Sequence, residues 1–403
     1  MKTPTGALSG IRVLDATQML AGPLAGTRLG DLGADVIKLE PPTSGEFNRT
    51  KGFDNKRSNG EMTTFLAVNR NKRSLAIDLK SEGGRDAVLR LVEKSDVFIQ
   101  NFKQGTAERL GVGYEQLREI NPRLIYCSIS GFGSTGPYRN KPGQDLIIQG
   151  YSGSMFSVGS ESDEPTPSAL WGPDVMTGYQ AVIGILAAIE ARHNSGLGQH
   201  VEVDMLSVVM DCQLQEIVTY LNTGSKPTRS QQKGAHASIP APYGVYQTRN
   251  SWMILSMIPL PLLGEILEDE FLQSLSQPND GQEYRDKIYE IVRAKFTMKD
   301  TEEWIRTFEA KGAWCGPVYD YESLVNDEHV IASNYIWEQP QIQGKSAKTV
   351  RPPIKLSDNP LSITRGAPAL GEHSKEILID LLGFNKEEFE NFVSNGQVKS
   401  MEV

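Results

Sequence analysis

The chain has 403 residues, of which 39% are hydrophobic and 23% are charged, a composition typical of a globular protein, and it is long enough for two or three domains or for one large and one small domain. Its formal net charge of −9 disfavours nucleic acid as a partner, because the phosphate backbone is bound through an excess of Lys and Arg. The three cysteines and five histidines are too scattered for a disulfide framework or a metal site, so we expect no metal.

The first residues lack the apolar core of a signal peptide. No apolar run reaches the roughly 18 residues that a membrane span needs. The sequence therefore predicts a cytoplasmic protein that does not enter a membrane.

The start of the chain predicts one strand-helix-strand unit. Residues 11–15 form a short strand pattern, Gly22-Pro23 opens a helix that runs to about residue 32, and residues 34–40 form a second strand. Pro is tolerated early in a helix because its missing N–H has no partner there anyway. The unit is Rossmann-like but has no Gly-x-Gly-x-x-Gly motif, which disfavours dinucleotide binding.

Further strands alternate with helices. We expect strands at 75–79, 97–100 and 124–129 and a helix at 83–94, whereas the polar residues 46–60 predict a mobile surface loop. This alternation indicates the α/β class, with a parallel sheet covered on both faces and ligands bound at the carboxyl ends of its strands.

The second half of the chain predicts a smaller domain. A helix at 205–221 is followed by a polar linker, a hairpin of strands 244–247 and 252–257, and helices at 262–275, 284–296 and 301–311. We therefore expect a large Rossmann-like domain at 1–224, a small α+β domain at 225–330, and a return to the large domain at 331–403.

The central stretch places an acidic residue at the start of an apolar helix. Asp174 follows Gly172-Pro173, and the apolar helix that begins there ends at Asn194-Ser195-Gly196. Asp174 fits two roles, an ordinary N-cap of the helix or a carboxylate nucleophile that forms a covalent acyl intermediate. The spacing alone leaves both open.

This stretch resembles the signature of the family III CoA-transferases. The resemblance covers Gly172-Pro173-Asp174, the helix, the turn at 192–199 and the run at 201–206, and it extends from Leu8 to about Val398. The family includes formyl-CoA and carnitine CoA-transferases, with the alpha-methylacyl-CoA racemases as a branch. By this resemblance, Asp174 is the residue that attacks the acyl-CoA thioester.

The resemblance also implies which residues contact coenzyme A. They match the family at or just beyond strand ends: Leu20, Ala21, Ile77, Asp78, Leu79, Lys80, Asn101, Phe102, Lys103 and Arg109. Among them, the cations Lys80, Lys103 and Arg109 are suited to hold the nucleotide phosphates. The alternative for each cation is a solvated surface side chain.

Three positions depart from the family pattern. Pro41 stands where formyl-CoA transferase has a phosphate-binding Arg, a role that Lys38, Arg49 or Arg73 could take over. The segment 231–238 does not reproduce the glycine-rich loop that guards the intermediate. Gln144 occupies the place of the racemase His, and an amide cannot exchange a proton near neutral pH.

The sequence is therefore identified as that of a CoA-transferase that moves CoA from an acyl-CoA to a carboxylic acid. The family mechanism implies an aspartyl anhydride and an aspartyl-CoA thioester at Asp174, with backbone N–H groups after Asp174 or at 131–136 stabilising the oxyanions. Coenzyme A enters as part of substrate and product, with no permanently bound cofactor. The resemblance also implies an interlocked homodimer. The alternatives are a racemase-type isomerase and a non-catalytic CoA-binding protein.

Overall fold

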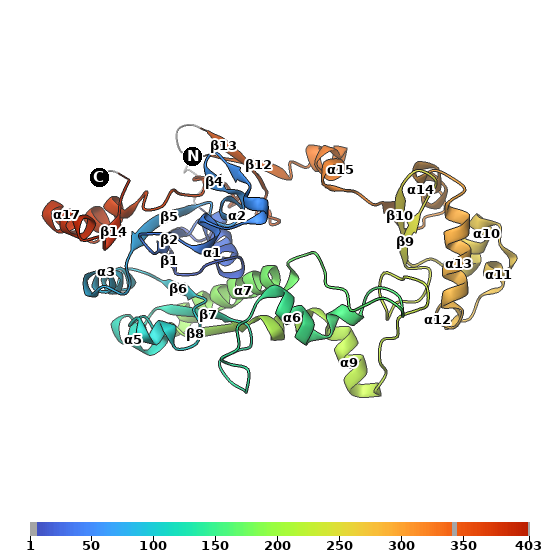
Figure 1. The fold of residues 1–403 in the computed structure, drawn as a ribbon, viewed down its shortest axis with the longest axis horizontal. Helices are drawn as coiled ribbons and strands as arrows, with labels where there is room; N and C mark the ends of the chain where they lie inside the picture. Colours follow the sequence, from blue (N-terminus) through green and yellow to red (C-terminus); the bar gives the residue numbers. More distant parts are fainter. Residues whose placement is uncertain (1–5, 341–344, 402–403) are drawn as a thin grey trace. The chain divides into compact units, whose positions relative to one another are not determined.

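The computed structural model describes residues 6–340 and 345–401 (Figure 1). The chain divides into two compact units. The first comprises residues 1–148, 171–209 and 329–403, and the second comprises residues 149–170 and 210–328. The sequence predicts domain boundaries at residues 224 and 330, and these bounds stay a prediction.

The first unit is built on a seven-stranded sheet with the order β14-β5-β2-β1-β6-β7-β8. The strands are β1 (Arg12–Asp15), β2 (Asp35–Glu40), β5 (Lys72–Ile77), β6 (Val97–Gln100), β7 (Ile125–Ser130), β8 (His200–Asp204) and β14 (Val398–Lys399). All neighbouring pairs are parallel except β14 with β5. The predicted α/β class is confirmed, and the carboxyl ends of six strands share one edge.

Helices cover both faces of this sheet, as alternating strands and helices predict. One face packs against α1 (Ala21–Asp31) and α7 (Gly172–Ser195). The other packs against α3 (Glu82–Val92), α5 (Tyr114–Ile120), the π-helical turn η5 (Glu376–Leu381) and α17 (Lys386–Ser394). The layers are visible in Figure 1, where the C-terminal helix lies near α3. Two apolar cores result, one on each face of the sheet.

The segment at 46–60 is more ordered than its polarity predicts. It holds the 3-10 turns η1 (Phe47–Arg49) and η2 (Phe53–Asn55) and the first strand of the pair β3 (Arg57–Ser58) and β4 (Glu61–Met62). Glu46 is only 4% exposed, and the Arg49 Nε lies 2.6 Å from the Glu40 Oε2. The prediction of a mobile surface loop was wrong for Glu46 and Arg49, which are both buried; the ion pair with Glu40 compensates for the burial of Arg49, and Glu46 accepts the Met19 N–H.

The remaining elements of the first unit are short. They are α2 (Thr63–Ala67), α4 (Thr106–Arg109) and the hairpin of β12 (Ile336–Pro340) and β13 (Ser346–Val350). Three helices extend across the bounds of the two units: α6 (Asp145–Ser152), α8 (Met205–Cys212) and α16 (Glu328–Ala332).

The second unit contains an antiparallel sheet with the order β11-β10-β9, formed by β9 (Gly244–Gln247), β10 (Trp252–Leu255) and β11 (Cys315–Pro317). The predicted hairpin is confirmed. Its helices are α9 (Leu214–Thr223), α10 (Leu260–Leu267), α11 (Glu270–Ser274), α12 (Asp280–Glu283), α13 (Arg285–Phe296), α14 (Thr301–Glu309) and α15 (Tyr321–Asn326), with the 3-10 turn η3 (Ser154–Phe156). The predicted helix at 262–275 is two helices, because Glu268 between them takes a left-handed conformation with φ of 52°.

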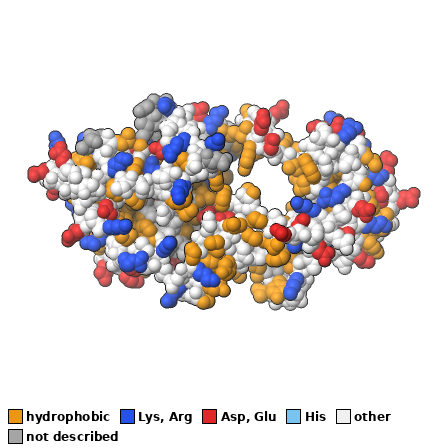
Figure 2. Space-filling model, in the orientation of Figure 1, with side chains coloured by type: hydrophobic (Ala, Val, Ile, Leu, Met, Phe, Trp, Pro, Cys, Tyr) orange, Lys and Arg blue, Asp and Glu red, His pale blue; other side chains and the backbone are white. Residues whose placement is uncertain are grey.

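The surface carries charges of both signs. Figure 2 shows Lys and Arg side chains interspersed with Asp and Glu side chains over the face drawn. Within the described residues, no helix has the length and apolar character to cross a membrane.

Candidate active site

The helix α7 presents Asp174 in its first turn. Trp171 is the N-cap residue and makes no side-chain cap hydrogen bond, and Asp174 is the third residue of the helix after Gly172 and Pro173. The helix ends before Gly196, whose φ of 72° suits a glycine. The interpretation of Asp174 as an ordinary N-cap was therefore wrong, and its carboxylate has another partner.

That partner is the beginning of α1. The backbone N–H of Ala21 faces the Asp174 carboxylate closely enough to lower its pKa. The two helices approach closely at Gly178, where an added Cβ would lie 2.8 Å from the Ala21 carbonyl oxygen. On the other side, the Asp174 N–H donates to the Oδ2 of Asp145 over 3.2 Å. Asp174 is thus fixed between a helix N-terminus and a second carboxylate.

Its surroundings change the acidity of Asp174. Burial, and then the charge of Asp145, raise the pKa of Asp174 from 3.8 to about 6, while the Ala21 N–H acts in the opposite direction. A carboxylate with this pKa is still mostly ionised at neutral pH and is more basic than an ordinary aspartate. Both properties suit a nucleophile.

Asp174 opens into a cleft of about 340 Å³ at the carboxyl edge of the sheet. The cleft is lined by residues that follow β1, β6 and β7: Gln18, Met19, Ala21, Asn101, Phe102, Lys103, Arg139, Lys141 and Gln144. This is the place where an open parallel sheet is expected to bind its ligand. Three of the lining side chains are cationic, so the cleft suits an anionic substrate.

The predicted CoA-binding residues divide into three groups: those in or beside the cleft, those at the end of β5, and Arg109. Ala21, Asn101, Phe102 and Lys103 line the cleft together with Asp174, and Leu20 is the N-cap residue of α1. The predicted residues Ile77, Asp78, Leu79 and Lys80 lie at the end of β5; Ile77 is buried, and Leu79 packs against the same core as Phe102.

Arg109 lies on α4, where its Nη2 donates to the Thr106 Oγ1 over 2.7 Å. It is not among the residues that line the cleft. The structure therefore brings Lys103 next to the Asp174 cleft but does not bring Arg109 there, and the role of each in binding CoA stays a prediction.

The three cations considered as substitutes for an arginine at position 41 are all engaged elsewhere. The Lys38 Nζ donates to the Thr17 carbonyl over 2.8 Å. Arg49 pairs with Glu40, and Arg73 pairs with Asp35 and Glu376 from the first half of β5. Whether one of the three cations takes over a phosphate contact after β2 stays a prediction.

The loop that carries the cleft residues Arg139 and Lys141 begins and ends at a glycine. A Cβ added at Gly131 would lie 2.3 Å from the Gly143 Cα, and one added at Gly143 would lie 2.2 Å from the Gly131 Cα. The loop 131–143 therefore begins and ends at one backbone crossing that only glycine allows. Next to this crossing, Gln144 lines the cleft and Asp145 is 1% exposed.

Sequence reasoning missed several of these residues. Gln18 and Met19 follow β1 directly, and Arg139 and Lys141 lie in the loop after β7. The rule that ligands bind at the carboxyl ends of parallel strands was a signal that could have found them. The role of Asp145 beside Asp174 depends on a contact across 29 residues, which no local pattern reveals.

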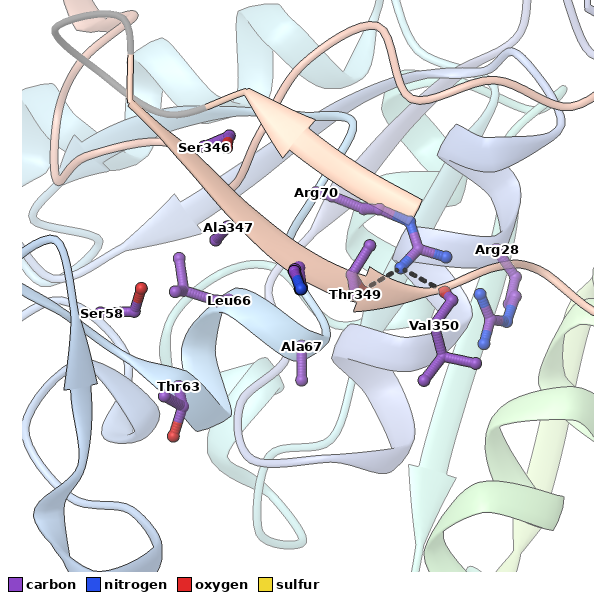
Figure 3. Close-up of a pocket in the computed structure, with 11 residues that line it drawn as sticks. Arg28, Ser58, Thr63, Leu66, Ala67, Arg70, Ser346, Ala347, Thr349 and Val350 are labelled. Atoms are coloured by element: carbon purple, nitrogen blue, oxygen red, sulfur yellow. Dashed lines mark hydrogen bonds between the residues drawn. The ribbon is translucent and has the colours of Figure 1, made fainter. Parts of the chain in front are cut away.

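Other cavities also lie in the first unit. One of about 380 Å³ adjoins the cleft and shares Phe102 and Lys103 with it. A larger one, of about 620 Å³, is lined by Arg28, Arg70, Leu66 and residues of β13 (Figure 3). Figure 3 shows Arg70 bonded to Thr349 and Val350. Arg28 belongs to the last turn of α1, at the amino edge of the sheet, so this larger cavity lies away from Asp174.

The segment 231–238, considered as a shield for the intermediate, belongs to the second unit. Gly234 pairs there with Gly159 as an isolated bridge. An added Cβ at Gly234 would lie 2.8 Å from the Tyr289 hydroxyl, so this glycine permits a close approach within the unit. Whether the segment shields the intermediate stays a prediction.

Comparison with known proteins shows the family of the chain. Residues 8–374 match CoA-transferase family III. The chain is 35% identical over 387 residues to a succinate–glutarate CoA-transferase of Agrobacterium fabrum, covering 93% of this chain and 95% of that protein. It is 32% identical over 417 residues to a formyl-CoA:oxalate CoA-transferase of Streptomyces avermitilis, covering 98% of this chain and 100% of that protein.

A solved structure has the same fold. The crystal structure of a CAIB/BAIF family protein from Brucella suis superimposes with a TM-score of 0.82 at 31% identity, covering 94% of this chain and 100% of that one. The chain therefore belongs to CoA-transferase family III and is an enzyme that transfers CoA between acyl-CoA thioesters and acids.

Proposed function

We propose that Asp174 is the nucleophile through which this enzyme moves CoA from an acyl-CoA donor to a carboxylic acid. The carboxylate attacks the thioester carbonyl, the carbon–sulfur bond breaks, and an aspartyl anhydride and the CoA thiolate result. The thiolate then attacks the Asp174 carbonyl of the anhydride, which releases the donor acid and leaves an aspartyl-CoA thioester. The acceptor carboxylate attacks this thioester to form a new anhydride, and the thiolate takes the acceptor acyl group.

One observation carries the proposal. Asp174 and Ala21 line the same cleft at the carboxyl edge of the sheet, and the Ala21 N–H lowers the pKa of the Asp174 carboxylate, whereas the N-cap of the Asp174 helix is Trp171. In the steps where the thiolate or the acceptor attacks the Asp174 carbonyl, negative charge develops on the oxygen of that carbonyl. The Ala21 N–H is placed to stabilise this charge. The Ala21 N–H is thus a third candidate for stabilising the oxyanions, besides the backbone N–H groups at the start of α7 and in the turn 131–136.

We propose dicarboxylic acids as the acid substrates. The relatives described above are named for succinate, glutarate and oxalate, which carry two carboxyl groups. Lys103, Arg139 and Lys141 give the cleft three cations for one carboxylate that does not react. The test compares glutarate with a monocarboxylate of equal chain length as acceptor. Equal specificity constants for the two acids would contradict this assignment.

The racemase alternative lacks its second proton-transfer group. Gln144 lines the cleft with Asp174, and its amide does not exchange a proton near neutral pH. A 2-methylacyl-CoA incubated with the enzyme in heavy water should gain no deuterium at the alpha carbon. Deuterium incorporation at a rate comparable to turnover would favour an isomerase.

We keep a homodimer and a cytoplasmic location as parts of this proposal. Helix α9 supports an assembly, because Leu214, Val218 and Leu221 expose apolar side chains at helical spacing, and Leu221 is 73% exposed. Sedimentation at low concentration tests the dimer. A fully active monomer of about 44.5 kDa would contradict it.

The decisive experiment traps the covalent intermediate. Wild-type enzyme with acyl-CoA and no acceptor should yield an aspartyl hydroxamate at Asp174 when hydroxylamine is added. Asp174→Asn, which keeps the size and an acceptor oxygen for the Ala21 N–H, is the matched control and should yield none. Near-normal transfer by Asp174→Asn would remove the proposed mechanism.

A further inference from the structure

The turn at residues 17–19 connects β1 to α1 and borders the cleft. Gln18 and Met19 line the cleft, and the chain reaches Ala21, which lines the same cleft as Asp174 and whose N–H lowers the pKa of Asp174, two residues after Met19. Met19 has a φ of 71°, in the left-handed region that residues other than glycine rarely adopt. An unbranched apolar residue in this conformation must be held there by its surroundings.

Side chains from other elements hold the first part of this turn. The Thr17 N–H donates to the Asp15 Oδ1 over 2.9 Å, and the Lys38 Nζ donates to the Thr17 carbonyl over 2.8 Å. Asn101 holds Gln18 at both backbone groups, accepting its N–H over 3.0 Å and donating to its carbonyl over 2.8 Å. The backbone of Thr17 and Gln18 is therefore fixed on each side.

Met19 is held by the segment that follows β2. Its N–H donates to the Glu46 Oε2 over 3.1 Å, and the Asn48 Nδ2 donates to its carbonyl oxygen. Glu46 is itself anchored, because its N–H donates to the Glu40 Oε2 over 3.1 Å and Glu40 pairs with Arg49. The side chains of Glu46 and Asn48 thus bind the N–H and the carbonyl of Met19, and Glu46 is itself held in place by its bond to Glu40.

The position of Glu46 is costly to the fold. The side chain is 4% exposed, and its Oε1 has no hydrogen-bond partner among the described residues. Burial raises the pKa of Glu46, as expected for a carboxyl group that loses its hydration. A polar group that breaks a local rule of stability is expected where it serves the active site.

We propose that Glu46 and Asn48 are positioning residues for CoA transfer. They hold Met19 in the left-handed conformation, and this aims the first turn of α1 so that the Ala21 N–H meets the Asp174 carboxylate. Without these contacts, Met19 relaxes toward negative φ and the beginning of α1 turns away from Asp174. The proposal rests on the proposed role of Asp174, and it concerns groups that do not touch the substrate.

The test uses Glu46→Ala, Glu46→Gln and Met19→Gly in the full-length enzyme, with kcat, KM and the pH profile as readouts. Glu46→Ala should lower kcat by on the order of tenfold or more while the KM for acyl-CoA changes little, because a misplaced group costs rate rather than binding. The acid limb of its kcat profile should move to higher pH, because the Ala21 N–H normally lowers the pKa of Asp174. Glu46→Gln keeps an acceptor for the Met19 N–H and should retain most of the activity.

A double-mutant cycle separates positioning from general stability. Glycine adopts positive φ without strain, so Glu46→Ala should cost less in a Met19→Gly background than in the wild type. Thr50→Ala, an exposed change on the same segment, is the matched control and should leave kcat and the pH profile unchanged. If Glu46→Ala does not fold, Asn48→Ala tests the same role, because it removes the other side-chain contact with the Met19 backbone and Asn48 is only half-buried.

The outcomes are distinguishable from failure of the proposed mechanism. If Asp174→Asn is inactive while the folded Glu46→Ala or Asn48→Ala variant keeps wild-type kcat and an unmoved acid limb, the positioning role is wrong. An additive double-mutant cycle also contradicts it. If Asp174→Asn transfers CoA normally, the proposed mechanism fails first and the positioning role fails with it.

Discussion

Replacing Asp145 by Asn should move the acid limb of the transfer reaction to lower pH. Asp145 is 1% exposed, and its Oδ2 accepts the Asp174 N–H over 3.2 Å. An Asn side chain has the same shape and can still accept this N–H through its oxygen, so the change removes a charge and leaves the contact in place. The variant therefore isolates the electrostatic effect of Asp145 on the nucleophile.

The expected magnitude follows from the pKa of Asp174. Burial, followed by the charge of Asp145, raises that pKa to about 6, so the wild-type nucleophile is about nine-tenths ionised at pH 7 and about one-tenth ionised at pH 5. The kcat of the wild type should fall by about tenfold for each pH unit below this value. Because burial is the larger cause and remains, the limb of Asp145→Asn should move by less than the whole difference between 3.8 and about 6.

The assay measures initial rates of CoA transfer from pH 4.5 to pH 8.5 at saturating donor and acceptor. The rate at pH 5, expressed as a fraction of the plateau, should be larger for Asp145→Asn than for the wild type. An acid limb that stays in place, or that moves to higher pH, would refute the assigned effect of Asp145 on the nucleophile.

Three further predictions follow from the site. Asp174→Asn should lower turnover by on the order of a thousandfold or more, yet raise the melting temperature at pH 8. The reason is the raised folded-state pKa of Asp174: the stability that this carboxyl group contributes is complete below pH 3.8 and is lost as the pH rises through about 6. The gain in melting temperature should therefore shrink toward pH 4, and a gain that does not shrink would contradict the pKa. Lys103→Ala should raise the KM for acyl-CoA more than Arg109→Ala, because Lys103 lines the cleft and Arg109 does not; kinetics with the reverse order would reassign the phosphate contact. Gly131→Ala should destabilise the protein by about 1–3 kcal/mol and reduce kcat, because its Cβ would lie 2.3 Å from the Gly143 Cα, and an unchanged denaturation midpoint would contradict that crossing.

Local patterns predicted most of the strands and helices of the sheet-based unit. Alternation and apolar runs placed β1, β2, β6 and β7 to within a residue or two, and Gly196 marked the end of α7. These elements follow local rules, because burial on both faces of a parallel sheet imposes apolar runs and a helix commonly ends at a left-handed glycine. The start of β5 was missed, because its first residue is the buried Lys72, whose Nζ pairs with the Asp15 Oδ2 over 2.7 Å.

The sequence by itself determined the class of fold and the family, and it singled out Asp174 as the candidate nucleophile. The order Gly172-Pro173-Asp174 and the amide at Gln144 are read directly from the chain, because the identity of a side chain sets which protons it can exchange. No long-range contact is needed to see either one.

Only the tertiary structure decided what surrounds Asp174. The Ala21 N–H, the Asp145 carboxylate and the Glu46 contact with Met19 come from segments far apart in the chain. The contacts of Asp145 and Glu46 act over distances of about 3 Å. Local propensity treats Arg49 as a surface residue, because burial of a charge is favourable only when a partner such as Glu40 has already been placed beside it. The pKa of the nucleophile and the geometry of its cleft are therefore properties of the packed fold, which no stretch of sequence contains alone.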